Sequence, residues 1–244
     1  MDPNIAFPGQ RMYEVVRPMI HLLDINRTGL QNFEALMALT NLASVGEPVR
    51  KRILAENGFP QIEHYLYEEH DMIQKAATEC ICNMVMSEDV AKLFEGENDR
   101  VKLLLLFTSN EDQATALAAS GALAILSSSV KICQKIVQVK NWLDHMLALA
   151  VNENIQIQHR GIYIITNMIR AEKDIAANII ESQILEVLMA VSKFEDSEKT
   201  MIRECAEAAL LKAAEYELIK PAQENGEGIV AHGEQKTPLQ DNLR

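Results

Sequence analysis

Aromatic residues, glycine and proline are all scarce in this sequence. Only 5% of its 244 residues are aromatic, and it has 10 Gly and 7 Pro, although 48% of its residues are hydrophobic. Alanine, leucine, isoleucine and methionine supply most of the apolar bulk. A chain rich in helix formers and poor in turn residues is typical of an all-α protein.

Long apolar runs and an excess of positive charge are also missing. The run LLLLF at Leu103 to Phe107 is far shorter than the ~20 residues that cross a bilayer. No charged segment followed by an apolar core opens the chain, so we expect a cytoplasmic protein without membrane contact. The net charge of -12, from 23 Lys and Arg against 35 Asp and Glu, disfavours nucleic acid and favours a neutral or basic protein partner.

Motifs for catalysis, metal binding or cofactor binding are absent as well. His64 and His70 stand six residues apart, whereas two metal ligands on one helix face stand three or four apart. No glycine-rich phosphate loop or nucleophile elbow occurs, so we expect neither an enzyme nor a cofactor. We expect the four cysteines to be small buried thiols: Cys80, Cys82, Cys133 and Cys205.

The chain does contain a repeat of about 42 residues. Asn41, Asn83 and Asn167 are separated by 42 and 84 residues, and the intervening position is Ile125. The fifth unit slips by three residues after residues 194–199, so that Lys212 stands where the other units have Asn. Three further columns are apolar throughout: Ile20, Ile62, Leu104, Met146 and Leu188; Leu23, Tyr65, Phe107, Leu149 and Val191; Leu39, Ile81, Leu123 and Ile165.

Breaker residues divide each unit into three helices. In the second unit we expect a short helix over Val49 to Glu56, a second helix from Pro60 to about Glu68, and a longer third helix from Asp71 to Met86. Three helices of this kind in about 42 residues follow the armadillo plan, whose units bury their apolar faces by stacking. We therefore predict an all-α, right-handed armadillo-repeat solenoid of about five units.

The two ends of the chain differ from the repeats. We expect residues 1–10 to form a leader, residues 11–220 the solenoid and residues 221–244 a flexible tail, because periodicity is lost after residue 221. The first residues contain no polar cap. We therefore expect that the chain was cut from a longer solenoid, and that its first face is apolar because it once packed on preceding repeats. Glu215 and Glu217 would give the last helix a more polar outer side.

Three segments carry a more specific resemblance. FEALMALTNLAS at residues 33–44, AATECICNM at 76–84 and QHRG at 158–161 resemble the C-terminal part of the UCS domain of myosin chaperones, over roughly residues 5–221. The resemblance implies that this chain binds the myosin motor domain while it folds. Full-length animal relatives also recruit the heat-shock chaperone Hsp90 through a tetratricopeptide domain, and nothing matching that domain occurs in this sequence.

The asparagine column is the strongest candidate site. Armadillo proteins that resemble importins use an Asn at this point of the third helix to hold the main chain of a peptide on the concave side. An amide offers a donor and an acceptor, so it can bind a peptide bond whatever side chain follows. Alternatively, the amides tie one unit to the next. Both interpretations remain open on the sequence alone.

Other residues share this face, because helix positions four apart are neighbours. Tyr163 and Arg160 are attractive because Tyr and Arg often dominate binding energy, although Tyr163 could form the rim of the core and Arg160 could pair with a neighbouring carboxylate. The predicted groove residues are Asn41, Asn83, Asn167, Met37, Glu79, Tyr163, Arg160, Ile125 and Glu34.

Two other functions compete with a chaperone. The first is a generic armadillo adaptor or transport receptor for linear motifs, although receptors for basic signals need several groove tryptophans and Trp142 is the only one here, in a second helix. The second is an assembly scaffold that uses its edges instead of its groove. Myosin binding by groove variants would separate these functions.

Overall fold

The protein is a stack of helical layers in the computed structural model, which describes residue 6 and residues 8–220. The predicted tail at 221–244 and most of the predicted leader lie outside the described residues. The helices are α2 (Arg11–His21), α3 (Gly29–Val45), α4 (Glu47–Ala55), α5 (Gly58–His64), η1 (Tyr65–Tyr67), α6 (Asp71–Met84), α7 (Glu88–Phe94), α8 (Arg100–Phe107), α9 (Gln113–Leu126), α10 (Val130–Val137), α11 (Trp142–Ala150), α12 (Ile155–Ala171), α13 (Lys173–Ile180), α14 (Ile184–Val191), η2 (Ser197–Lys199) and α15 (Thr200–Glu215).

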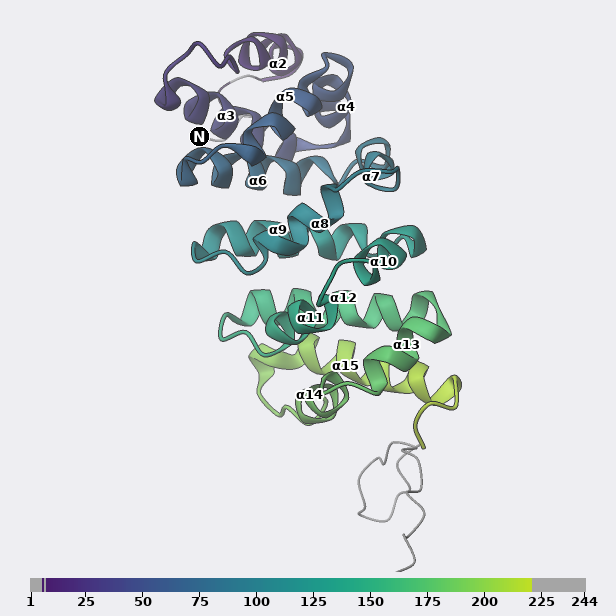
Figure 1. Ribbon diagram of the computed structural model, residues 1–244. Coiled ribbons are helices and arrows are strands. Elements are labelled where there is room, and N and C mark those ends of the chain that lie inside the picture. The colour runs from purple at the N-terminus through teal and green to yellow at the C-terminus, as the bar shows by residue number, and fades with distance from the viewer. Residues whose placement is uncertain (1–5, 7, 221–244) are drawn as a thin grey trace, which may run out of the picture.

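Each layer contains one long helix, the third of its unit. The third helices α3, α6, α9, α12 and α15 contact one another in chain order. Figure 1 shows them as successive layers from the purple N-terminal end to the yellow C-terminal end, with the shorter helices crossing beside them. The prediction of three-helix units is confirmed from the second unit to the fifth, and the third helix of the second unit ends two residues earlier than expected.

Local sequence signals set where the helices begin. Thr28 forms a capping box with Gln31 at the start of α3, and Asp112 and Asn154 cap α9 and α12 through their side-chain oxygens. These cap positions also lie 42 or 84 residues apart, so the repeat includes the helix starts. Side-chain oxygens at this position satisfy backbone N–H groups that have no partner inside the helix.

Asparagine also makes the turn between the first and second helices of two units. Asn57 and Asn141 have positive φ values of 56° and 59°, a backbone conformation that Asn tolerates better than most residues. They are 84 residues apart and precede α5 and α11. The same turn chemistry therefore recurs at the same point of the repeat.

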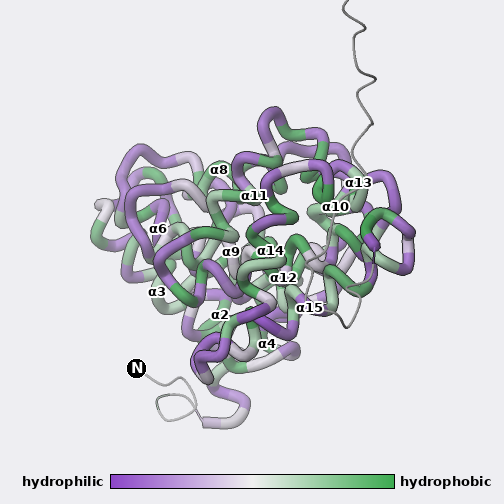
Figure 2. The backbone as a smooth tube through the Cα atoms, turned by 90° about the horizontal axis from the view of Figure 1, so that it is seen from below, coloured by the Kyte–Doolittle hydropathy of each residue, from purple (hydrophilic) through white to green (hydrophobic). Residues whose placement is uncertain are grey.

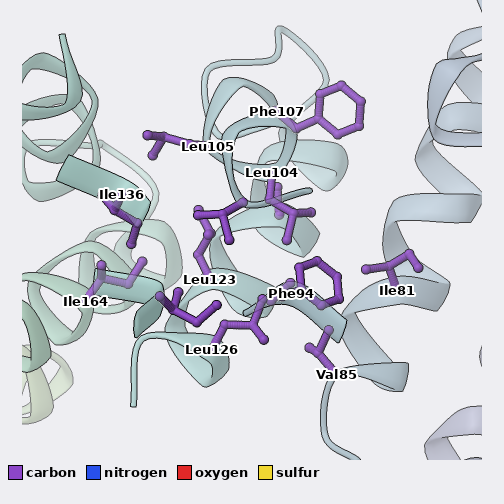
Figure 3. Close-up of a cluster of buried hydrophobic side chains, with 14 of the residues drawn as sticks. Ile81, Val85, Phe94, Leu104, Leu105, Phe107, Leu123, Leu126, Ile136 and Ile164 are labelled. Atoms are coloured by element: carbon purple, nitrogen blue, oxygen red, sulfur yellow. The ribbon is translucent and has the colours of Figure 1, made fainter. Parts of the chain in front are cut away.

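The three apolar columns form the core. Every residue of these columns is buried, with an exposed fraction of 9% or less. Figure 3 shows how neighbouring units share this core: Phe94 lies beside Val85 and Leu126, and the labelled side chains come from α6, α7, α8, α9, α10 and α12. A single continuous core along the stack is what repeats that cannot bury their own faces require.

In the end-on view of Figure 2, hydrophobic segments in green and hydrophilic segments in purple succeed one another along the tube. The outer side of the first helix is more polar than expected: Arg11, Glu14, Arg17 and His21 of α2 are exposed, whereas Val16 is buried. The exposed side of α2 is therefore mixed and not wholly apolar, since Tyr13 is also 38% exposed there.

The cysteines are partly as predicted. Cys80 and Cys133 are buried, but Cys82 and Cys205 are only half-buried. All four are free thiols, and burial raises the pKa of Cys80 and of Cys133 to about 12, so both remain protonated at neutral pH. No helix within residues 8–220 is both long enough and apolar enough to cross a bilayer.

Candidate functional site: the third-helix face

The predicted groove residues belong to the third helices α3, α6, α9 and α12, and we call the surface that they form the third-helix face. Tyr163 and Ile125 are exposed, with fractions of 41% and 37%, and Glu34 is also exposed. The remaining predicted residues are half-buried: Asn41, Asn83, Asn167, Met37, Glu79 and Arg160. All of these residues are thus at least partly accessible to solvent, at the level of four successive units.

Two of the three asparagines brace adjacent units. Asn83 donates from Nδ2 to the carbonyl oxygen of Thr40 on α3, at 3.0 Å, and Asn167 donates from Nδ2 to Oγ of Ser127, at 2.9 Å. Asn41 makes no side-chain hydrogen bond to the described residues. The bracing that the sequence left open as an alternative is therefore present at Asn83 and Asn167.

Bracing does not exhaust the hydrogen-bonding capacity of these amides. A primary amide has two N–H groups and a carbonyl oxygen with two lone pairs, and each brace uses one N–H group. Within the described part of the chain, Oδ1 of Asn83 and Oδ1 of Asn167 accept no hydrogen bond. Both side chains are half-buried, so the brace orients each amide while its oxygen remains available to an N–H group from another polypeptide.

The side chain of Arg160 extends from α12 to α9, the third helix of the preceding unit. It donates from Nη1 to the carbonyl oxygen of Leu117 on α9, and its guanidinium lies against Gly121. A Cβ on Gly121 would come within 3.0 Å of Nη1 and of Sγ of Cys82 on α6. The missing side chain at Gly121 therefore makes the space in which the side chains from α6 and α12 meet.

Arg160 does not pair with a carboxylate among residues 8–220, so the predicted alternative of an ion pair is not found there. Burial lowers the pKa of Arg160, and only the neighbouring Cys82 opposes that effect. An arginine side chain nevertheless stays charged at neutral pH. The face therefore carries a partly desolvated positive charge whose described partner is a neutral carbonyl.

Glu79 is the half-buried acidic residue of the same face. It lies on α6, and burial raises the pKa of its carboxyl group, while Lys75 opposes that shift and Asp112 adds to it. Lys75 itself lies 3.6 Å from Asp112 at the start of the next third helix. The third-helix face thus combines two half-buried side chains of opposite charge, Glu79 and Arg160, with the exposed Glu34.

An open pocket at one edge of this face was missed by the sequence reasoning. It has a volume of about 470 Å³, and Met86, Ile125 and Ser128 line it together with residues of α7 and α10. Met86 is 55% exposed and stands three residues after Asn83. Extending the groove column by one further helical turn would have included it.

His159 is half-buried, which no pattern in the sequence indicated. Its Nε2 atom is buried and has no hydrogen-bond partner among the described residues. Burial, followed by the charge of Arg160, lowers the pKa of its imidazole. His159 therefore stays neutral at pH values where a free histidine begins to take up a proton.

No protein-family profile matches the sequence. The human protein called unc-45 homolog B is 43% identical over 224 residues, which are 90% of this chain and 24% of that protein. The solved structure of UNC-45 from Drosophila melanogaster has a TM-score of 0.85 at 48% identity, covering 90% of this chain and 28% of the other. The chain spans about a quarter of the length of the relatives it matches.

Two further solved structures are similar to this chain in fold. The myosin chaperone UNC-45 from C. elegans, solved with an Hsp90 peptide, has a TM-score of 0.78 at 29% identity and covers 87% of this chain and 24% of the other. A designed armadillo repeat protein in complex with the peptide (KR)4 has a TM-score of 0.72 at 18% identity, covering 86% and 88%, and supports the fold alone. The prediction of an all-α armadillo solenoid is confirmed.

Proposed function

This chain is homologous to about a quarter of an UNC-45 protein, and on that premise we propose that it is a chaperone module that holds the myosin motor domain, or a segment of it, on the third-helix face. The C. elegans relative is described as a myosin chaperone. The UCS resemblance of residues 33–44, 76–84 and 158–161 points to the same client.

The observation that carries this proposal is the orientation of the braced amides. Asn83 and Asn167 are each fixed by a hydrogen bond to the preceding unit, and each leaves Oδ1 free among the described residues. A hydrogen bond of this kind contributes only about 0.5–1.5 kcal/mol net. A ladder of such amides therefore needs apolar contacts as well, and Ile125 and Tyr163 expose apolar surface between them.

The proposed role is binding and not catalysis. The charged groups of the face are Glu34, Glu79 and Arg160, and no cofactor is needed for them to contact a polypeptide. We propose a cytoplasmic location, because the client is cytoplasmic. Hsp90 is a second proposed partner, since the C. elegans relative was solved with an Hsp90 peptide, but we assign no residues of this chain to it.

The test is the affinity of the purified full chain for a purified myosin motor domain. Tyr163→Ala and Ile125→Ala remove exposed apolar contacts from the third-helix face, and each should weaken binding about tenfold, the loss that truncation of a central contact residue causes. Leu106→Ala is the matched control, because Leu106 is 47% exposed on the second helix α8. All variants must keep the melting temperature of the wild type.

Three results are distinguishable. Loss of affinity in Tyr163→Ala and Ile125→Ala, with Leu106→Ala unchanged, supports the third-helix face as the client site. Equal affinity in all four proteins would show that the myosin contact lies elsewhere, as an edge-binding scaffold requires. A wild type that fails to bind the motor domain would overturn the proposed client itself.

A further inference from the structure

The fold holds Arg160 in a position where most of its guanidinium N–H groups have no hydrogen-bond partner among residues 8–220. One of its five N–H groups donates to the carbonyl oxygen of Leu117, and the rest of the group lies beside Gly121 and Cys82. The bond to Leu117 fixes the direction of the side chain across α9. The guanidinium is thereby preorganised on the third-helix face instead of moving freely in water.

The charge of this guanidinium is not compensated within the described residues. Salt bridges there join other side chains, and the neighbours of Arg160 are a carbonyl oxygen, a thiol and a glycine. The half-buried acidic residue of the face is Glu79 on α6, separated from α12 by α9, and its charged neighbours are Lys75 and Asp112. Partial burial of a charge that has only neutral partners is unfavourable, so an anionic ligand would gain from the pairing.

The residues beside Arg160 on α12 indicate which kind of anion would bind there. Tyr163 stands one turn after Arg160 on the same side of α12, and Asn167 stands a further turn along. Tyr163 offers apolar ring surface and Asn167 offers an amide oxygen, which suits a polypeptide better than a free ion. The chain as a whole carries a net charge of -12, so a strongly acidic segment would be repelled.

We propose that Arg160 binds the side-chain carboxylate of a single Asp or Glu within the segment held on the third-helix face, an inference that rests on the proposed function. Arginine matches a carboxylate because its planar fork can donate two parallel hydrogen bonds. The segment is otherwise apolar or neutral, because its remaining contacts are Tyr163, Ile125 and the asparagine amides. Arg160 thus sets the register of the segment along the stack.

The experiment compares the affinity of the full chain for the purified myosin motor domain in the wild type, Arg160→Gln, Arg160→Lys and the control Arg17→Gln. Arg17 is an exposed arginine on α2, which is not a third helix. Loss of a charge-assisted pair should weaken binding by Arg160→Gln roughly ten- to hundredfold. Arg160→Lys keeps the charge but loses the fork, so its affinity should lie between the wild type and Arg160→Gln.

A second readout does not depend on Arg160→Gln folding. The Nε–H resonance of Arg160 in the wild type, identified by its absence from Arg160→Lys, should shift with millimolar acetyl-Ala-Asp-Ala-amide and stay in place with acetyl-Ala-Asn-Ala-amide. A shift with the Asp peptide alone supports the carboxylate site.

The failures of the two proposals are separable. Wild-type affinity in Arg160→Gln of unchanged melting temperature, or equal responses to the two peptides, would overturn the carboxylate site. A wild type that ignores the motor domain but discriminates between the peptides would overturn the proposed client while supporting the site.

Discussion

Asn83 on α6 donates a hydrogen bond from Nδ2 to the carbonyl oxygen of Thr40 on α3, at 3.0 Å and across 43 residues of sequence. This carbonyl belongs to a neighbouring layer of the stack. The same amide therefore fixes the spacing of two units and orients its own oxygen. Structural bracing and ligand binding are compatible roles for this side chain, because they use different atoms.

Replacing Asn83 by Ala removes this brace and should lower the free energy of unfolding by about 1 kcal/mol, and by up to about 3 kcal/mol if the Thr40 carbonyl is left without a partner. Urea unfolding of the purified chain measures the change. Asn41→Ala is the control, because Asn41 makes no such bond to the described residues, and its stability should change by less than about 0.5 kcal/mol. Equal destabilisation of both variants would contradict a specific brace at Asn83.

Gly161 should not tolerate a methyl group, although it lies inside α12, where Ala favours the helix by about 1 kcal/mol. A Cβ at this position would lie 2.6 Å from Cβ and 2.8 Å from the carbonyl carbon of Leu149 on α11. Overpacking of this kind costs about 1–3 kcal/mol. Thermal and urea unfolding should therefore show Gly161→Ala to be the less stable protein.

Gly29→Ala is the matched comparison for Gly161→Ala. A Cβ on Gly29 would lie 3.4 Å from Cδ1 of Ile73, an ordinary contact with the end of a side chain. Its stability should equal that of the wild type or exceed it slightly. A Gly161→Ala protein as stable as Gly29→Ala would show that α11 and α12 can move apart without cost.

Lys135 joins α10 to the turn that follows α7. Its ammonium donates to the carbonyl oxygens of Phe94 and Gly96 and to Oδ1 of Asn98, and its burial lowers its pKa. Lys135→Met should therefore lower the free energy of unfolding by about 1–3 kcal/mol, because charged hydrogen bonds are lost while the carbonyls remain. Lys131→Met serves as the control, since the Lys131 side chain is 70% exposed in its pair with Glu95.

His159 should make the stability of the protein depend on pH. Burial lowers its pKa in the folded state below the unfolded value of about 6.5, so below that pH the unfolded chain binds more protons than the folded chain. The contribution of neutral His159 is complete above about pH 6.5 and is lost as the pH falls toward the lower folded-state pKa. Melting temperatures between pH 7.5 and pH 5 measure the effect.

A substitution isolates this contribution. His159→Gln removes the titrating group, so its melting temperature should fall less than that of the wild type between pH 7.5 and pH 5. His70→Gln is the control, because His70 is exposed before α6, and it should follow the wild type. A wild type and a His159→Gln variant with the same pH dependence would contradict the prediction.

The candidate site was predictable in its location and not in its contacts. The 42-residue spacing placed Asn41, Asn83 and Asn167 on one face, because residues at equal positions of stacked repeats share an environment. It did not reveal that Asn83 bonds to Thr40, since this depends on how far one layer is turned relative to the next. The exposed Met86 stands three residues after Asn83 and was missed because the column was ended one turn too early.

The periodicity of side chains determined the fold of this protein. Apolar columns such as Leu39, Ile81, Leu123 and Ile165 can be buried together only if units of equal length stack, so the armadillo architecture follows from the order of residues alone. Tertiary structure decided which polar groups meet. The missing Cβ of Gly121 lets Arg160 reach Leu117 across α9, and such contacts between distant residues depend on the packing distance and the twist between layers, which no local pattern encodes.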